Sequence, residues 1–370
     1  MKYLAFDLGG VLFDFDYNIA LKKIKKDLSV SVDTVIDAFF KKDFTLDYEM
    51  GIVTDYEFYT KFKTNFAPTL TYQEFIDVWC DIFIPKEKII DLVERLHYIH
   101  KIILISNINR LHFEFLYKKY PKVFSFFSDL ILSYKLKSIK PQRRIYEELQ
   151  KRFNVSFADI IYIDDRVDLM PYAKQLGLNC IQFQNYEQLL SLLDYYNVKI
   201  IDEHKKNIFR KLKNTLSKYK NCLLVGIGNK LRGDDAIGIE IAEALKNKIS
   251  FDILNAEVVI ENYLHKLCEG GYDLILFIDA ANIDQDIEIF NIDEIPNNLL
   301  TFTHNSAFKL IANYLKNFSK CDILLLALKI EYTAINEGLS KESEQLKNVI
   351  VDFFIKNFPQ QESQWVLEEN

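Results

Sequence analysis

The chain has 370 residues, a formal net charge of −7 and 49% hydrophobic residues. A chain of this length exceeds what one hydrophobic core usually serves, so we expect two domains. The acidic balance argues against a dedicated nucleic-acid binder, and the absence of an apolar run of about 18 residues argues against a transmembrane helix.

The first predicted element is an apolar strand, MKYLAFD, which ends at Asp7 and is followed by a Gly9-Gly10 turn. From residue 17 to about residue 90, apolar stripes alternate with charged residues at helical spacing, as in IALKKIKKDL. These stripes predict a helical cap inserted after the first strand. Such a cap would cover the site at the strand end and select the substrate.

Three later segments of the first half also place polar residues where an apolar run ends or turns. Taken singly, each of these residues could be an ordinary helix cap or turn residue. Together with Asp7 they form a set for phosphoryl transfer, because a carboxylate can attack phosphorus, acidic groups can hold Mg²⁺, and lysine and serine can hold phosphate oxygens. The residues are Ser106 and Asn107 in KIILISNIN, Lys140 in SIKPQ, and Asp164 and Asp165 in DIIYIDD.

This ordered set resembles the haloacid dehalogenase superfamily over about residues 1–196. Within it, FDLGGVLFDFD, SNINRLHFEFLYKKYP and LSYKLKSIKPQRRIY look like the bacterial α-D-glucose-1-phosphate phosphatases and their relatives. The resemblance implies a Rossmann-like parallel sheet with a helical cap, and a phosphatase that acts on a small phosphorylated substrate through an aspartyl-phosphate. It also implies the roles of the site residues, which are Asp7 as nucleophile, Ser106 and Lys140 as catalytic phosphate-binding groups, Leu8, Gly9 and Asn107 as substrate-binding positions, and Asp7, Asp164 and Asp165 as Mg²⁺ ligands.

One position departs from the usual pattern of these phosphatases. They generally carry a second Asp two residues after the nucleophile, as general acid for the leaving group, and here that position is Gly9. General acid–base catalysis typically contributes about 10² to 10⁴ in rate. A sugar anomeric oxygen leaves more easily than a simple alkoxide, which favours an active phosphatase. The alternative is that this half keeps the fold as a non-catalytic binding or regulatory module.

Residues 197–220 are rich in lysine and arginine, while Ile208, Leu212 and Leu216 recur at helical spacing. This pattern predicts a solvated linker helix with one face resting on a domain. A basic docking surface for an acidic partner is the alternative.

The second half opens with LLVGIGNKLRGDDAIGIEIAEAL, an apolar strand that runs through a glycine-rich turn into Asp234, Asp235 and an amphipathic helix. A second strand, YDLILFIDAAN, ends at Asp279, and a third element, LLTFTHN, supplies His304. Singly, such an Asp is typical of a helix N-cap and such a His of a structural residue. Two carboxylates and one imidazole at the ends of apolar runs predict a divalent-metal site. Asp234 stays open between a cap and a supporting group.

The GIGN-x-x-x-x-DDA-x-G start, the later I-D-A and the T-H-N look like the hydrogenase maturation endopeptidase family over about residues 221–358. The resemblance implies an α/β/α sandwich and an enzyme that removes a C-terminal peptide from the large subunit precursor of nickel–iron hydrogenase. It places the Ni²⁺ contacts on Asp235, Asp279 and His304, with the nickel borne by the substrate. This half has no evident Ser-His-Asp or Cys-His arrangement, so metal-assisted attack by water is the simplest hypothesis.

Five scattered cysteines, without a C-x-x-C pair, indicate reduced thiols, and MKYLAFD has the pattern of a core strand rather than of a signal peptide. We therefore expect a cytoplasmic, bifunctional hydrolase with no nucleic-acid or membrane partner. Its expected parts are a hydrolase domain at 1–196, a linker helix at 197–220, a protease domain at 221–358 and a frayed tail at 359–370.

Overall fold

The computed structural model of the chain describes residues 1–35, 43–295, 311, 314–318, 321–332, 334–335 and 338–360. The chain divides into two compact units, Met1–Ile200 and Ile201–Asn370. Within the described ranges, every helix is too short or too polar to cross a membrane.

The first unit is built on a five-stranded sheet in the order β5-β4-β1-β6-β7, and every neighbouring pair is parallel. Phe6 of β1 lies opposite Leu104 of β4 and Ile163 of β6, so these three strands end at the same edge. Their near-continuous apolar sequences suit a parallel sheet that is covered on both faces. The strands are β1 (Tyr3–Phe6), β4 (Lys101–Ser106), β5 (Asp129–Leu132), β6 (Ile160–Asp164) and β7 (Asn179–Gln182).

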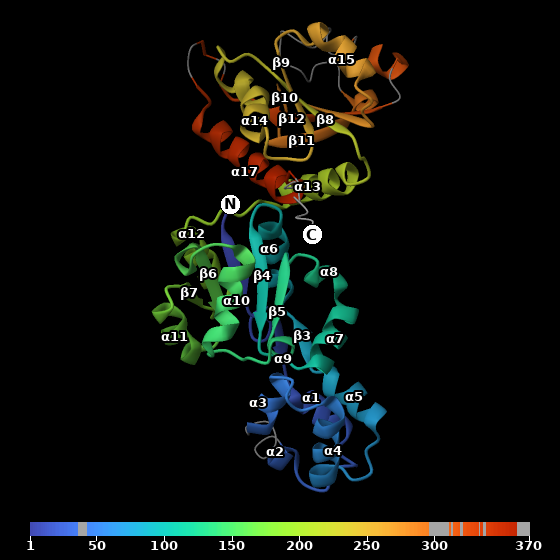
Figure 1. Cartoon of the computed structure of the whole chain (residues 1–370), viewed down its shortest axis with the longest axis vertical. Helices are drawn as coiled ribbons and strands as arrows, with labels where there is room; N and C mark the ends of the chain where they lie inside the picture. The colour runs from blue at the N-terminus through green and yellow to red at the C-terminus, as the bar shows by residue number, and fades with distance from the viewer. Residues whose placement is uncertain are drawn as a thin grey trace, which may run out of the picture. The chain divides into compact units, whose positions relative to one another are not determined.

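Helices cover both faces of this sheet and bury a hydrophobic cluster on each (Figure 1). One cluster joins alternate strand residues to α6, α7 and α12, and the other joins the opposite residues to α10 and α11. The helices are α6 (Glu87–His97), α7 (Arg110–Lys119), α8 (Pro121–Phe124), α9 (Ser133–Leu136), α10 (Arg143–Phe153), α11 (Met170–Gln175) and α12 (Tyr186–Tyr195).

A helical cap follows β1, and the antiparallel pair β2 (Phe13–Phe15) and β3 (Phe83–Pro85) leads into and out of it. The cap has its own aromatic core, which includes Phe58, Phe75 and Trp79. Its helices end at Cys80, whereas the sequence pattern extends the cap to about residue 90, because the amphipathic α6 packs on the sheet instead. The cap helices are α1 (Tyr17–Lys23), α2 (Val32–Val35), α3 (Asp43–Glu49), α4 (Asp55–Phe66) and α5 (Tyr72–Cys80).

The second unit has a five-stranded sheet in the order β11-β12-β10-β8-β9. Four strands are parallel, but β11 runs antiparallel to β12. The connection from β10 to β11 is too short for the crossover that a parallel strand requires, so the chain reverses direction. The strands are β8 (Cys222–Ile227), β9 (Asp252–Glu257), β10 (Leu274–Ala281), β11 (Ile287–Asn291) and β12 (Asp322–Lys329).

Helices also cover both faces of the second sheet. Helix α14 (Ile237–Leu245) packs against β8 and β10, and α17 (Lys341–Asn357) packs against α14. Helix α15 (Leu264–Glu269) contributes to the cluster on the other face. Helix α13 (Glu203–Leu216) belongs to this unit, where its Phe209 ring stacks on Phe353 at 4.4 Å between centroids. As predicted from their spacing, Ile208, Leu212 and Leu216 are buried.

Candidate functional sites

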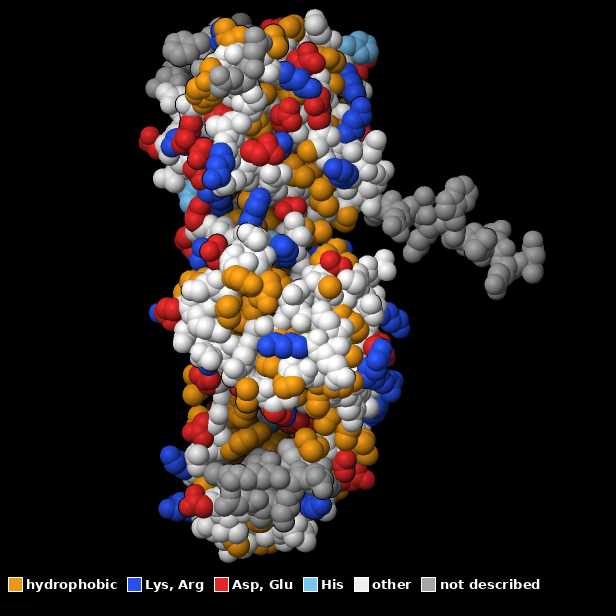
Figure 2. All heavy atoms as spheres, turned by 90° about the vertical axis from the view of Figure 1, so that its left-hand side faces the viewer, with side chains coloured by type: hydrophobic (Ala, Val, Ile, Leu, Met, Phe, Trp, Pro, Cys, Tyr) orange, Lys and Arg blue, Asp and Glu red, His pale blue; other side chains and the backbone are white. Residues whose placement is uncertain are grey.

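The first site lies at the carboxyl ends of the strands of the first unit. Asp7 directly follows β1, Ser106 is the last residue of β4, and Asp164 is the last residue of β6. Because parallel strands end at one edge, this topology gathers the three side chains, and open α/β folds bind their ligands there. All three are buried. In the space-filling view, the surface between the cap and the sheet layer is hollowed, with acidic side chains inside (Figure 2).

Lys140 lies at the centre of the acidic groups of this site. Its Nζ is 2.8 Å from Asp7 Oδ1 and 2.6 Å from Asp164 Oδ2, and it donates to the Ile105 carbonyl oxygen at 3.2 Å. The side chain is only 2% exposed. A buried cation must be paired to be tolerated, and here both carboxylates supply that pairing. The structure thus brings Lys140 together with Asp7 and Asp164, and its catalytic role stays a prediction.

Asn107 holds the backbone of Lys140. Its Oδ1 accepts from Lys140 N at 2.7 Å, and its Nδ2 donates to the Lys140 carbonyl oxygen at 3.1 Å. These bonds make Asn107 a positioning residue for the lysine. The substrate contact that the sequence suggests for Asn107 stays a prediction.

Asp7, Asp164 and Asp165 each offer a carboxylate oxygen, and these atoms lie within 4.8 Å of one another. Asp165 is only partly buried, and its carboxylate approaches the backbone of Gly10 so closely that a Cβ there would lie 2.2 Å from Asp165 Oδ2. Gly10 also has a φ of +72°, a conformation that other residues rarely adopt. Three carboxylates are the hard oxygen donors that Mg²⁺ prefers, so the residues fit this ion.

Burial and neighbouring charges shift the pKa values of the three aspartates of the first site. Burial raises the pKa of Asp7 to about 7, against the lowering effect of Lys140. Burial also acts on Asp164, but the charge of Lys140 and hydrogen bonds from Lys140 and Tyr162 hold the pKa of Asp164 below its usual value. Burial and the neighbouring Asp164 raise the pKa of Asp165. Such opposed shifts are typical of functional sites.

Leu8 and Gly9 offer only their backbone to this site. The Leu8 side chain is buried in the hydrophobic core, and its carbonyl oxygen accepts from Leu12 N and Phe13 N at 2.9 and 3.0 Å. Any contact of these two positions with a phosphate therefore runs through backbone N–H groups. That contact stays a prediction.

We expect Lys140→Met to destabilise the first unit by about 3–5 kcal/mol, because two buried carboxylates would lose their shared cation. Denaturant unfolding of the full chain measures the effect. Lys151→Met, on the surface of α10, is the matched control and should change little. Equal unfolding midpoints for the two variants would contradict the structural role of Lys140.

The second site lies at the carboxyl end of the second sheet. Asp279 is in β10 and Asp235 is in a short 3-10 turn, η4 (Gly233–Ala236), between β8 and α14. Both are buried, and Asp279 is fully so. Asp279 Oδ1 accepts from Ala280 N at 2.8 Å, whereas its Oδ2 has no hydrogen-bond partner among the described residues. Burial first, and then the charge of Asp235, raise the pKa of Asp279 well above its usual value.

His304, the third predicted ligand, lies outside the described residues. The chemistry of Asp235 and Asp279 fits a divalent cation. The buried Oδ2 of Asp279 has no hydrogen-bond donor among the described residues, and the negative charge of Asp235 acts on the Asp279 carboxyl group. The grouping of all three predicted nickel contacts stays a prediction.

Asp234 fastens the loop that follows β12. It accepts from Ser340 N at 2.7 Å, Ser340 Oγ at 3.0 Å and Tyr332 N at 3.0 Å, and Glu331 N lies 3.3 Å away. Ser340 is the N-cap of α17. The sequence left Asp234 open between a helix cap and a supporting group. Because its carboxylate accepts from these donors, it acts as a supporting group that holds the loop in place.

We expect Asp234→Ala to destabilise the second unit by about 3 kcal/mol, because buried donors would lose a charged acceptor. The exposed Asp284 provides the matched control, Asp284→Ala, which should remain within about 0.5 kcal/mol of the parent chain. Thermal and denaturant unfolding of both variants would measure the difference. A loss as small as that of the control would contradict the anchoring role.

Sequence reasoning missed one residue near the first site. Glu49 ends α3 of the cap, and its carboxyl group interacts electrostatically with Arg166, Asp7 and Lys140. The sequence did contain one indication of Glu49: it is an acidic residue in the last turn of a helix, where the helix dipole disfavours negative charge. Its position over the site depends on packing between cap and sheet, which the local pattern does not contain.

The first unit is similar to known proteins. A family model for haloacid dehalogenase-like hydrolases matches residues 1–177. The D-ribitol-5-phosphate phosphatase of Bacteroides thetaiotaomicron is 25% identical over 191 residues, covering 50% of this chain and 93% of that protein. A solved structure of a HAD-family enzyme from the same organism, in complex with magnesium and inorganic phosphate, has 23% identity and a TM-score of 0.46, covering 51% of this chain and 98% of that one.

A different relative matches the second unit. A protein of Methanocaldococcus jannaschii, described as a candidate hydrogenase maturation protease, is 31% identical over 156 residues, covering 37% of this chain and 92% of that protein. Both predicted resemblances and the two-domain α/β fold class are confirmed. The chain therefore belongs to the hydrogenase maturation protease family through its second unit, joined to a haloacid dehalogenase-like hydrolase domain in its first.

Proposed function

We propose that the first unit is a Mg²⁺-dependent phosphatase of small phosphate monoesters, with sugar and polyol phosphates as the substrate class. The observation that carries this proposal is the convergence of Asp7, Asp164 and Asp165 around Lys140 at one sheet edge. The named activity of the ribitol-phosphate relative supports the substrate class. The narrower expectation of glucose 1-phosphate has no such support.

In this proposal Asp7 attacks phosphorus and forms an aspartyl-phosphate, which water then hydrolyses. Lys140 keeps Asp7 in place and balances negative charge, while Ser106 and the backbone N–H groups of Leu8 and Gly9 hold phosphate oxygens. Bound Mg²⁺, held by Asp7, Asp164 and Asp165, would neutralise charge on the phosphate. The cap encloses the substrate and limits the access of water.

The test is release of inorganic phosphate from a panel of sugar and polyol phosphates, with Mg²⁺ and with EDTA. We expect release that depends on Mg²⁺. The alternative, raised by Gly9, is that the first unit binds phosphate without catalysis. It would be supported if the wild-type protein releases no phosphate from any ester while inorganic phosphate raises its melting temperature.

We infer that the second unit is an endopeptidase that processes the C-terminus of a nickel–iron hydrogenase large subunit precursor. Asp279 carries this inference, because a fully buried carboxylate oxygen without a donor, beside Asp235, suits a cation supplied from outside. The family to which the second unit belongs supports the substrate.

In this proposal the nickel belongs to the substrate, and Asp235, Asp279 and His304 contact it. Carboxylate and imidazole ligands bind Ni²⁺ and Zn²⁺ alike, so selection for nickel rests on the loaded precursor and not on the ligands. Attack by water on a metal-polarised carbonyl is the simplest hydrolytic route. We expect cleavage of the nickel-loaded precursor and no cleavage of the nickel-free precursor, as judged by gel mobility and by the mass of the released peptide.

A further inference from the structure

The first site lacks a proton donor at the position where related phosphatases carry one. Gly9 has no side chain, and a Cβ at this position would lie 3.1 Å from Cε1 of the Phe15 ring. A side chain on residue 9 would therefore require the Phe15 ring to shift by a small amount. Poor leaving groups need protonation, which typically contributes about 10² to 10⁴ in rate, so the donor must come from elsewhere in the fold.

Glu49 approaches the site from the cap. Its carboxyl group interacts with Asp7 after β1, with Lys140 and with Arg166 after β6. The charge of Glu49 also acts on Tyr17 of α1, whose pKa is raised first by burial and then by this charge. Glu49 is partly buried, so it combines access to a bound substrate with shielding from bulk water.

The segment that carries Glu49 is fastened to the sheet layer. Ser133 Oγ, at the start of α9, lies 2.6 Å from the Glu49 carbonyl oxygen and accepts from Ile108 N at 2.9 Å. Lys137 Nζ donates to the carbonyl oxygen of Gly51. Gly51 has a φ of +64°, and a Cβ there would lie 2.5 Å from the Tyr134 carbonyl oxygen, so only glycine permits this approach.

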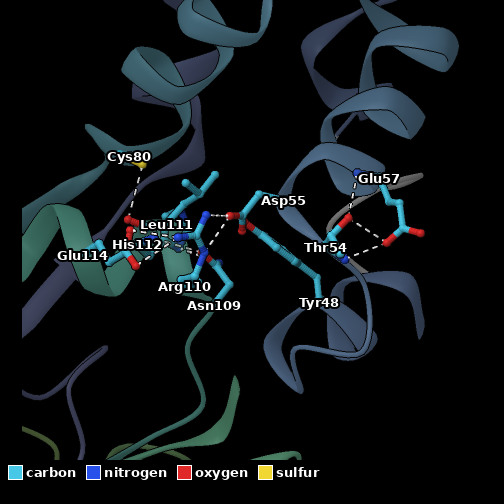
Figure 3. A network of polar contacts seen from close by, with 10 residues as sticks. All are labelled: Tyr48, Thr54, Asp55, Glu57, Cys80, Asn109, Arg110, Leu111, His112 and Glu114. Carbon is cyan, nitrogen blue, oxygen red and sulfur yellow. Dashed lines mark hydrogen bonds and ion pairs between the residues drawn. The ribbon is translucent and has the colours of Figure 1, made fainter. Parts of the chain in front are cut away.

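A network of hydrogen bonds around Asp55, here called the latch, joins Tyr48 and Asp55 of the cap to Arg110 of α7 (Figure 3). Tyr48 OH donates to Asp55 Oδ1 at 2.8 Å, and Arg110 Nε of α7 donates to Asp55 Oδ2, also at 2.8 Å. Arg110 further bonds Glu114 at 3.1 Å. Asp55 is buried, and it therefore joins α3 and α4 of the cap to the helix that follows Ser106 and Asn107. The latch and the Ser133 contact together hold the backbone around Glu49 beside the sheet layer.

We propose that Glu49 is the general acid of the first site, in place of the side chain absent at Gly9; this inference rests on the phosphatase function proposed above. When Asp7 attacks phosphorus and the P–O bond to the leaving group breaks, the Glu49 carboxyl gives its proton to the departing oxygen, which leaves as an alcohol. The Glu49 carboxylate then takes a proton from the water that attacks the aspartyl-phosphate. The Asp7 O–P bond breaks, phosphate departs, and both carboxyl groups return to their starting states.

The protonation state of Glu49 agrees with this role. Burial raises the pKa of Glu49 to about 7. The negative charge of Asp7 adds to this rise, whereas the positive charges of Arg166 and Lys140 oppose it. The acid form is therefore populated at neutral pH and lost as pH rises above about 7. Burial and Glu49 raise the pKa of Tyr17, which stays neutral and does not compete as a base.

The test compares two esters in the full chain with Mg²⁺, one with a good leaving group, p-nitrophenyl phosphate, and one with a poor one, ribitol 5-phosphate. Glu49→Gln should lower kcat on ribitol 5-phosphate by about 10²-fold or more and change kcat on p-nitrophenyl phosphate only a few-fold. Glu74→Gln is the matched cap control, since Gln also serves the capping box at Thr71, and should leave both rates unchanged.

Retained hydrolysis of p-nitrophenyl phosphate also shows that Glu49→Gln is folded. An equal loss on both esters, or no loss on either, would overturn the general-acid assignment while leaving the phosphatase function intact. Failure of the wild-type chain to hydrolyse either ester would instead remove the phosphatase function on which the assignment rests.

Discussion

Asp7→Asn should abolish phosphate release by the first unit, with a loss of about 10⁴-fold or more in kcat, the scale seen when an enzyme loses its nucleophile. An amide oxygen is too weak a nucleophile to form the acyl-phosphate bond. The variant also removes one of the three oxygen donors that fit Mg²⁺. Phosphate release from ribitol 5-phosphate measures the loss.

Asp14→Asn is the matched control for this variant. Asp14 lies in the same segment but is exposed and pairs with Lys86 at 2.8 Å, so the same chemical change should leave the rate near that of the wild type. Phosphate release by Asp7→Asn at the wild-type rate would mean that Asp7 is not the nucleophile.

Asp279→Asn should lower precursor cleavage by more than about 100-fold, because even the outer-sphere partner of a metal ligand can be worth that much. Asn keeps the shape of the side chain but lacks the negative charge that a cation requires. The substitution should not destabilise the second unit. Burial raises the pKa of Asp279, and a raised acid pKa costs folding stability at pH values above its usual range, a cost that Asn does not carry.

Asp273→Asn, just before the opposite end of β10, is the control for Asp279→Asn. Asp273 is exposed and accepts from Lys220 N and Asn221 N, which Asn can also do. Cleavage and thermal unfolding measured together separate the two effects. Unchanged cleavage by Asp279→Asn would contradict the metal-contacting role, and a large drop in melting temperature would contradict the account of its burial.

The residues that lie at strand ends were predictable. Asp7, Ser106 and Asp164 follow apolar runs of the length of buried strands, and parallel strands bring such residues to one edge whatever the details of packing. In the second unit the same reasoning placed Asp279 at a strand end, whereas β10 continues to Ala281, and Asp235 lies in the turn η4 between β8 and α14. Lys140 was assigned to the first site from the order of the motifs along the chain, because no local pattern marks it.

What the sequence could not supply depends on tertiary contacts. Glu49 looks like an ordinary charged cap residue until Ser133 and Gly51 fix it beside the sheet. Asn107 has the pattern of a strand-end ligand, but its bonds go to the backbone of Lys140. Asp234 and Asp235 are adjacent acidic residues, and only the loop after β12 shows that the first of them anchors Tyr332 and Ser340.

The central claim is that one chain carries two separate hydrolytic sites. Both reactions, release of phosphate from ribitol 5-phosphate and cleavage of the nickel-loaded hydrogenase precursor, should be measured side by side on full-length Asp7→Asn and Asp279→Asn proteins. We expect Asp7→Asn to lose only phosphate release and Asp279→Asn to lose only peptide cleavage. Loss of both reactions in one folded variant, or retention of both in either, would contradict this claim.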